Sequence, residues 1–179
     1  FSTKEKRASG YSRTSGSKEP MATQCLPSKS AGSSGKPGCR AVVVEEGNAI
    51  PAFPAVIIAP DTRALPALLS RPLNLNPDCD LITAGVTGTN GKTTVAWLLQ
   101  SMLESLAGPC GLLGTIRYET GAASQPAPLT TPDGPALYGL LAEMRIHDCR
   151  AVSMEISSHA LDQERTADLA LDLAVLTNL

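Results

Sequence analysis

The chain has 179 residues, of which 42% are apolar and only 3% are aromatic. Its net charge of −2 at pH 7 gives no bulk attraction for nucleic acid or anionic membranes, and the scarcity of aromatic rings argues against base-stacking modules. No apolar run approaches the roughly 20 residues that a membrane-spanning helix needs. We therefore expect no nucleic-acid partner and no membrane span. The length suits one domain, or one domain with part of another.

The charge is unevenly distributed along the chain. Residues 1–40 carry eight Lys or Arg and two Asp or Glu, whereas the rest carries seven basic and fifteen acidic residues. This basic stretch is rich in Ser and Gly and poor in large apolar residues, so it cannot bury enough surface to offset its ordering entropy. We predict a disordered tail, interpreted as a linker or unrelated upstream sequence in preference to an organelle transit peptide. Because the chain begins with Phe1 and stops at Leu179 after a predicted strand, we expect a fragment of a longer protein.

The part that follows the tail predicts a small α/β unit. Two β-branched runs, residues 41–44 and 55–59, are typical of buried strands. Asp61 is a favourable cap for a short helix reaching residue 70, and Pro66 should kink or shorten that helix. Residues 41–73 are therefore predicted to form a small unit that is separate from the part that follows.

A polar linker at residues 74–80 precedes the next predicted unit. An apolar strand at 81–86, a glycine loop at 87–91, a helix at 92–106 and another strand at 111–116 follow in order. A strand, a helix and a strand in this order form a right-handed parallel unit. Apolar residues of the helix recur at the spacing expected of a core-facing stripe: Val95, Leu98, Leu99, Met102, Leu103 and Leu106.

The second half of the chain continues the alternation of helices and strands. Thr131 is a favourable N-cap for a helix that reaches about residue 148. Strands are predicted at 151–156 and 171–177. The residues of the helix expected to face inward are Leu137, Leu140, Leu141 and Met144. The pattern predicts a doubly wound, mostly parallel α/β sheet of the P-loop type over residues 81–179.

The strongest functional signal is the octapeptide T-G-T-N-G-K-T-T at residues 87–94, here called the phosphate loop. Its glycines let backbone amides approach a polyphosphate at a helix N-terminus, where the helix dipole adds positive potential. Lys92 supplies a mobile charge for the β- and γ-phosphates, and the Thr93 hydroxyl can bind the Mg²⁺ of the nucleotide. The general pattern has a glycine where this chain has Val86, but strand, loop, Lys-Thr pair and helix all agree. The residues expected to bind ATP are Gly88, Thr89, Asn90, Gly91, Lys92, Thr93 and Thr94.

This form of the loop resembles that of the Mur ligases and their relatives, which join an amine to a carboxylate with ATP. The segments L-T-T-P-D at 129–133, M-E-I-S-S-H-A-L at 154–161 and L-T-N-L at 176–179 resemble motifs of one family member. That member adds the third residue of the peptidoglycan stem. The resemblance covers residues 41–179, most strongly from residue 81 onward, and it implies that residues 41–73 are a remnant of an N-terminal UDP-binding domain. It implies a monomeric cytoplasmic ligase that forms an amide between UDP-MurNAc-L-Ala-D-Glu and an amino acid through an acyl phosphate, with an organellar location if the tail is a transit peptide.

The resemblance also implies roles for individual residues. It implies catalytic roles for Lys92 and Glu155, and it implies that Thr93 and Glu155 are ligands of Mg²⁺. Glu155 follows an apolar strand, whose carboxyl end faces the ligand crevice in an open α/β sheet. The muramoyl-peptide substrate is placed against Thr130, Thr131, Ser157, Gln163 and Arg165. From the residues alone, Thr131 could be only a helix cap, Arg165 a surface arginine and Glu155 a solvated acid, although the planar fork of Arg165 suits a carboxylate or phosphate.

Two alternatives remain open on the sequence. One is another ligase of the Mur superfamily, such as a cyanophycin-type synthetase or a folylpolyglutamate synthase. The other is a non-catalytic P-loop remnant that binds nucleotide. A GTPase is disfavoured because no N-K-x-D segment occurs. The added amino acid is not specified, and we expect no ligation by this chain alone, since the family's carbamylated lysine, S-R-D-H-L-D motif and C-terminal domain would lie beyond Leu179.

Overall fold

The computed structural model describes residues 24–25, 41–47 and 55–178. Contacts divide the chain into two compact units, Phe1–Ala59 and Pro60–Leu179, which are treated separately below. Most of the tail predicted to be disordered lies outside the described residues. Two of its residues, Gln24–Cys25, form a short strand, so the prediction does not hold for that pair.

The first unit contains a small sheet whose strands are β1 (Gln24–Cys25), β2 (Val42–Glu45) and β3 (Val56–Ala59). β2 pairs with β3 in parallel and with β1 in antiparallel orientation. Both predicted strands are confirmed, and the valines of β2 are buried. The prediction that the second strand is buried is wrong for Ile57 and Ile58, which are 53% and 54% exposed. Their β-branched side chains favour the extended backbone whether or not a core covers them.

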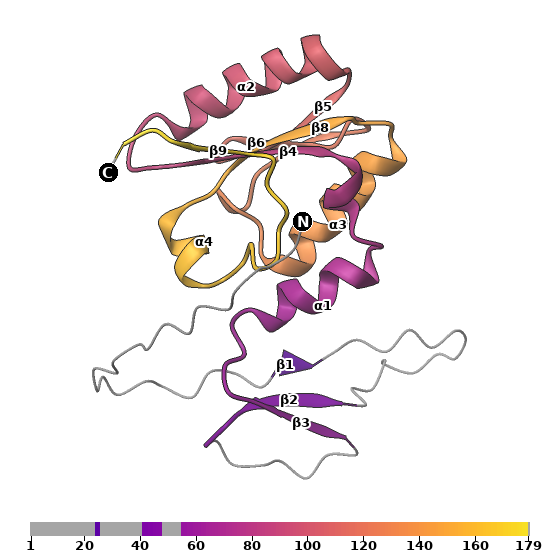
Figure 1. Cartoon of the computed structure of the whole chain (residues 1–179), viewed down its shortest axis with the longest axis vertical. Helices are drawn as coiled ribbons and strands as arrows, with labels where there is room; N and C mark the ends of the chain where they lie inside the picture. Colours follow the sequence, from indigo (N-terminus) through magenta and orange to yellow (C-terminus); the bar gives the residue numbers. More distant parts are fainter. Residues whose placement is uncertain (1–23, 26–40, 48–54, 179) are drawn as a thin grey trace, which may run out of the picture. The chain divides into compact units, whose positions relative to one another are not determined.

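The second unit is built on a six-stranded sheet in the order β7-β6-β5-β8-β4-β9 (Figure 1). Its strands are β4 (Ile82–Thr87), β5 (Cys110–Leu113), β6 (Arg117–Glu119), β7 (Ser124–Pro126), β8 (Ala151–Glu155) and β9 (Leu173–Leu176). β5, β8, β4 and β9 run parallel, and β6 and β7 add an antiparallel edge. Val86 pairs with Glu155 because β8 lies beside β4, so the carboxyl ends of these strands are adjacent.

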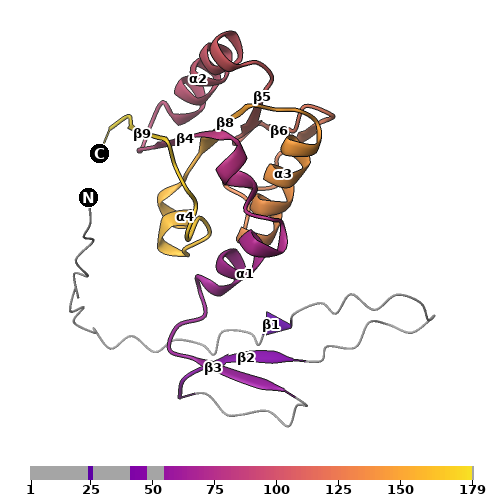
Figure 2. The ribbon, with the colours of Figure 1, turned by 45° about the vertical axis from the view of Figure 1, so that its right-hand side comes forward.

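Helices cover both faces of this sheet, which confirms the doubly wound α/β class. They are α1 (Leu65–Leu73), α2 (Lys92–Ala107), α3 (Gly134–Ile146), the short α4 (Ser158–Asp162) and the 3-10 helix η1 (Pro77–Asp80). α2 lies on one face, and α1 and α3 lie on the other (Figures 1 and 2). Across the described part of the chain, none of the helices is long and apolar enough to cross a membrane.

The core beneath α3 follows the predicted pattern. Leu137, Leu141 and Met144 are fully buried, and Leu140 packs partly buried against the same cluster. They contact Val152 and Met154 of β8, which the sequence predicted as a buried strand. The buried side chains of α3 and β8 therefore form one apolar layer, here called the α3 core.

The predicted stripe of α2 is wrong at three positions. Leu98, Met102 and Leu106 are 59%, 59% and 82% exposed. The helix approaches the sheet instead through Ala96, whose carbonyl accepts a hydrogen bond of 2.8 Å from the buried Ser153 hydroxyl. Val95 and Leu99 flank that contact. A small residue permits this close approach, and it rotates the larger leucines away from the sheet.

The first part of the second unit also differs from the prediction. α1 begins at Leu65 with Ala64 at its N-cap position, so the prediction that Asp61 caps this helix is wrong. The helix packs against α3. Pro66 lies in its first turn, where a missing amide is tolerated, so no kink is required there. The expected linker folds into η1, whose buried Asp78 accepts hydrogen bonds from Arg71. The boundary between the two compact units lies after Ala59, whereas the sequence predicted a domain boundary after residue 73. A UDP-binding role for residues 41–73 stays a prediction.

Candidate functional site

The phosphate loop joins β4 to α2 at the carboxyl end of the sheet. Gly88 and Gly91 have φ angles of 133° and 82°, a region that glycine adopts without the strain imposed by a Cβ. Val86, which departs from the general pattern, is fully buried within β4, so it belongs to the strand and not to the loop. Gly91 caps α2 without any side-chain acceptor. The first amides of α2 have no intrahelical partner and remain free to bind an anion.

Lys92 folds back over this loop. Its Nζ donates hydrogen bonds to the carbonyls of Gly88 at 2.7 Å and Thr89 at 3.2 Å. The ammonium therefore lies over the loop whose amides it would help to complement. Because carbonyls are weaker acceptors than phosphate oxygens, a bound polyphosphate can take over these hydrogen bonds.

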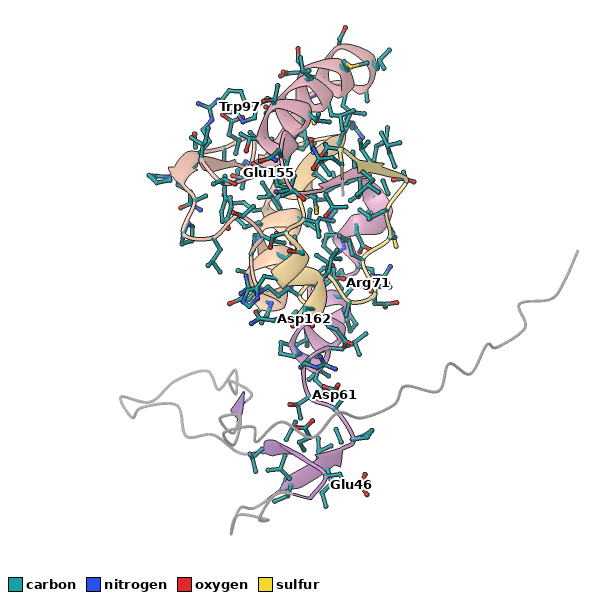
Figure 3. All side chains as sticks on the ribbon, turned by 90° about the vertical axis from the view of Figure 1, so that its left-hand side faces the viewer. Glu46, Asp61, Arg71, Trp97, Glu155 and Asp162 are labelled. Atoms are coloured by element: carbon teal, nitrogen blue, oxygen red, sulfur yellow. The ribbon has the colours of Figure 1, made fainter. Side chains whose placement is uncertain are left out.

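Glu155 is the central acid of the site. It ends β8, is 1% exposed and lies next to α2 (Figure 3). Its carboxylate accepts hydrogen bonds from the Thr93 hydroxyl at 3.0 Å, the Thr115 amide at 2.9 Å and the Thr115 hydroxyl at 3.1 Å. These donors offset the cost of burying the carboxylate. The structure thus brings Glu155 to the phosphate loop, as the resemblance implied.

The two oxygens assigned to Mg²⁺ have a spacing that suits the ion. Thr93 Oγ1 and Glu155 Oε2 are 3.0 Å apart. Adjacent ligands in an octahedron with Mg–O distances of about 2.1 Å are separated by about 3 Å. No group of three or more His, Cys, Asp or Glu gathers among the residues the structure describes. An ion here would therefore use these two oxygens together with phosphate and water, which is the usual pattern for Mg²⁺ at nucleotide sites.

Thr131 is buried behind Glu155 and is not a helix cap. Its hydroxyl donates to the Glu155 carbonyl at 2.9 Å and accepts from the Ser157 amide at 3.0 Å. Asp133 caps α3 instead, accepting from the Ala136 amide at 2.9 Å. The cap prediction is therefore wrong, because the next acidic residue is an equally good cap and Thr131 is engaged by the strand end.

Thr115 is a site residue that the sequence analysis missed. Besides binding Glu155, its hydroxyl lies 3.1 Å from that of Thr130, one of the residues predicted to bind substrate. Its position directly after Gly114, at the carboxyl end of β5, could have drawn attention to it. Polar residues that follow parallel strands gather at one edge of a sheet.

The remaining predicted substrate residues cluster around Thr131. Arg165 donates through Nη1 to the Thr131 carbonyl at 3.0 Å and through Nε to Gln163 Oε1 at 2.8 Å. The Ser157 hydroxyl caps α4 by accepting from the Ala160 amide at 3.1 Å. Glu155 therefore joins two groups of hydrogen bonds, since its carboxylate faces the phosphate loop and its carbonyl faces Thr131.

Three of the predicted ATP residues, Thr89, Asn90 and Thr94, have exposed side chains. The amides of Thr89 and Asn90 donate to Asn178 Oδ1, both at 3.0 Å. Thr94 lies in the first turn of α2, where the amides have no intrahelical partner and suit an anion. A role of these three residues in binding ATP stays a prediction.

Comparison with known proteins shows that the chain is similar to Mur ligases. Residues 86–179 match the family described as Mur ligase middle domain. The chain is 39% identical over 142 residues to the UDP-N-acetylmuramoyl-L-alanyl-D-glutamate--2,6-diaminopimelate ligase of Lawsonia intracellularis, covering 79% of this chain and 28% of that protein. For the ligase of that name from Pseudomonas syringae pv. tomato, identity is 47% over 104 residues, 58% of this chain and 21% of the relative.

A solved structure of a ligase with the same name is similar in fold. It matches with a TM-score of 0.56 and 29% sequence identity, over 69% of this chain and 26% of that chain. The chain thus spans between 21% and 28% of the length of these relatives.

Proposed function

Since this chain belongs to the Mur ligase family, we propose that it is part of an ATP-dependent ligase acting in peptidoglycan synthesis. The ligase would join the third amino acid to UDP-MurNAc-L-Ala-D-Glu. The similar proteins carry 2,6-diaminopimelate in their names, so we propose a diamino acid as the amine substrate. Cytoplasmic location and a monomeric state remain predictions.

The observation that carries the proposal is the place of Glu155. Its buried carboxylate lies 3.0 Å from the Thr93 hydroxyl at the phosphate loop, while its own carbonyl accepts from Thr131. A nucleotide site and a set of polar groups suited to a second, anionic substrate therefore share one residue. A ligase needs this proximity, because the carboxylate that is activated must lie near the phosphate that activates it.

When bound, ATP supplies the phosphoryl group that activates the substrate carboxylate as an acyl phosphate, and Mg²⁺ neutralises phosphate charge. Lys92 and the free amides at the start of α2 lower the repulsion between the two anions. Thr93 and Glu155 would hold the ion. The incoming amine then displaces phosphate to form the amide.

Substrate recognition is proposed for the group around Thr131. Arg165 presents a guanidinium already oriented by Gln163 and by the Thr131 carbonyl. Such a fixed fork suits a carboxylate or a phosphate of the muramoyl peptide. Thr130 extends this group toward Thr115 and the loop. Because the chain spans about a quarter of its relatives, we expect binding, and no amide formation, by residues 1–179 alone.

Titration with a fluorescent ATP analogue in the presence of Mg²⁺ tests the nucleotide site. Lys92→Ala should raise the Kd about thirtyfold, as expected for loss of a charged hydrogen-bonding group worth about 2 kcal/mol. Arg150→Ala is the matched control, since it removes an exposed positive charge at the start of β8, the opposite end from Glu155. Equal, weak signals from the wild type and Lys92→Ala would contradict the proposal.

Calorimetric titration with UDP-MurNAc-L-Ala-D-Glu tests the second substrate. Arg165→Met should weaken binding more than Arg165→Lys, which keeps the charge but loses the fork. Binding that is indifferent to both changes would remove Arg165 from the proposed substrate site and leave only the nucleotide site in place.

A further inference from the structure

The segment that follows β9 lies against the phosphate loop. β9 pairs with β4 in parallel, and beyond its end the Thr177 amide donates to the Thr87 carbonyl at 2.9 Å. Figures 1 and 2 show the C-terminal end of the described chain beside the turn that leads into α2. The L-T-N-L segment therefore has a contact with the site that the proposed function does not explain.

The side chain of Asn178 satisfies three backbone groups of the loop. Its Oδ1 accepts hydrogen bonds from the amides of Thr89 and Asn90, both at 3.0 Å. Its Nδ2 donates to the Asn90 carbonyl at 3.0 Å. A carboxamide is the side chain that offers both an acceptor and a donor in this arrangement.

Thr177 adds a second attachment. Its hydroxyl lies 2.6 Å from the Asn90 carbonyl and 3.2 Å from the Thr87 carbonyl. A Cβ on Gly88 would clash with this hydroxyl and lie only 2.9 Å from the Asn178 carbonyl oxygen. The glycine at residue 88 is therefore required by the close approach of Thr177 and Asn178, as well as by its φ of 133°.

These contacts divide the amides of the loop into two sets. Asn178 occupies those of Thr89 and Asn90, whereas the amides at the start of α2 have neither an intrahelical partner nor a side-chain cap on Gly91. The occupied set belongs to residues 89–90, here called the outer turn of the loop. The free set points out of the N-terminus of α2, where an anion binds.

We propose that Thr177 and Asn178 are positioning residues that hold the phosphate loop in its nucleotide-binding shape before the nucleotide arrives. They fix the outer turn and leave the amides of α2 for phosphate. The expected gain in nucleotide affinity rests on the proposed function. The hydrogen bonds that attach Thr177 and Asn178 to the loop do not depend on that function. A preformed loop loses less conformational entropy when the nucleotide binds.

Amide hydrogen exchange by NMR on the chain without nucleotide tests the attachment. Asn178→Ala should accelerate exchange of the Thr89 and Asn90 amides about tenfold, while amides of β8 keep the wild-type rate. Fast exchange of both amides already in the wild type, or no acceleration in Asn178→Ala, would overturn the proposal whether or not ATP binds.

Titration with a fluorescent ATP analogue and Mg²⁺ tests the consequence. Asn178→Ala should raise the Kd about tenfold, and Thr177→Val should raise it several-fold. Thr177→Ser keeps the hydroxyl and should restore wild-type affinity. Tighter binding by Asn178→Ala would mean that Asn178 competes with phosphate, and unchanged binding would mean that the loop needs no support; either result overturns the proposal. Absence of binding by the wild type would defeat the nucleotide site instead, leaving the exchange experiment to decide the attachment.

Discussion

The loop edge and the α3 core belong to one unit but are held together by different forces. The loop edge comprises the phosphate loop with Thr115, Thr131 and Glu155, where polar groups meet at hydrogen-bond distances. The α3 core is apolar and sealed, with Leu137 and Leu141 completely buried. Stability should therefore depend mainly on the α3 core, and ligand recognition on the loop edge. Substitutions in the two regions can separate these properties.

The largest expected effect is on stability, in the α3 core. Leu141→Ala should lower the free energy of unfolding by about 3 kcal/mol, because it removes buried methyl groups and leaves a cavity. Denaturant unfolding measures the change, and nucleotide affinity of the folded fraction should stay within about twofold.

Leu106→Ala is the matched control for that change. The same side chain is removed from α2, where Leu106 is 82% exposed, so the loss should stay below about 0.5 kcal/mol. Equal destabilisation by the two variants would break the contrast between core and surface. A large fall in nucleotide affinity of folded Leu141→Ala would show that the two regions are coupled.

A smaller effect is expected at the loop edge, from Thr115→Val. The substitution keeps the amide that binds Glu155 but removes the hydroxyl that lies 3.1 Å from its carboxylate. The Mg²⁺-dependent gain in ATP affinity should fall by about 1 kcal/mol, measured by titration with and without the ion. Thr115→Ser should preserve it, and thermal unfolding of both variants should resemble the wild type. A loss of stability without a change in the Mg²⁺ dependence would make Thr115 a structural residue only.

The smallest effect concerns a buried ionisable group away from the loop edge. Burial raises the pKa of the Cys110 thiol to about 12, although a hydrogen bond from the Ser153 backbone opposes the rise. The sulfur also lies 3.4 Å from the Gly111 carbonyl. The folded chain then holds a proton that the unfolded chain releases near pH 9, so stability falls as the pH rises. From pH 7 to pH 9 the loss assigned to this thiol is roughly 0.4 kcal/mol.

Denaturant unfolding of the wild type and Cys110→Ala at both pH values measures this difference. The variant should show a shallower loss of stability between them. Identical slopes would contradict the assignment to Cys110.

Much of the second unit could be predicted because its sequence periods are unambiguous. The inward residues of α3 recur at helical spacing, and β8, with Ala151, Val152 and Met154, is buried throughout. The phosphate loop is signalled by its glycines, which adopt the positive φ of Gly88 and Gly91 without strain, and by the Lys-Thr pair at the start of α2. Local pattern and tertiary contact agree at these places, as they do in most well-folded chains.

The failures have a common physical origin in contacts made at long range. The stripe of α2 allows two orientations, and Ser153, far along the chain, selects the one that leaves Leu98 exposed. The sequence predicts Thr131 as a helix cap, but in the fold its hydroxyl donates to the carbonyl of Glu155 at the end of β8. The roles of Thr115 and Asn178 depend on strands that meet only in the folded sheet. A linear pattern does not contain that information.

The central claim is that Glu155 and Thr93 hold Mg²⁺ beside a nucleotide bound at the phosphate loop. Titration of the wild type and Glu155→Gln with a fluorescent ATP analogue, each with Mg²⁺ and with chelator, tests it most directly. The account predicts that Mg²⁺ tightens binding about tenfold in the wild type and hardly at all in Glu155→Gln, with similar affinities in chelator. An equal response to Mg²⁺ in both proteins would contradict it.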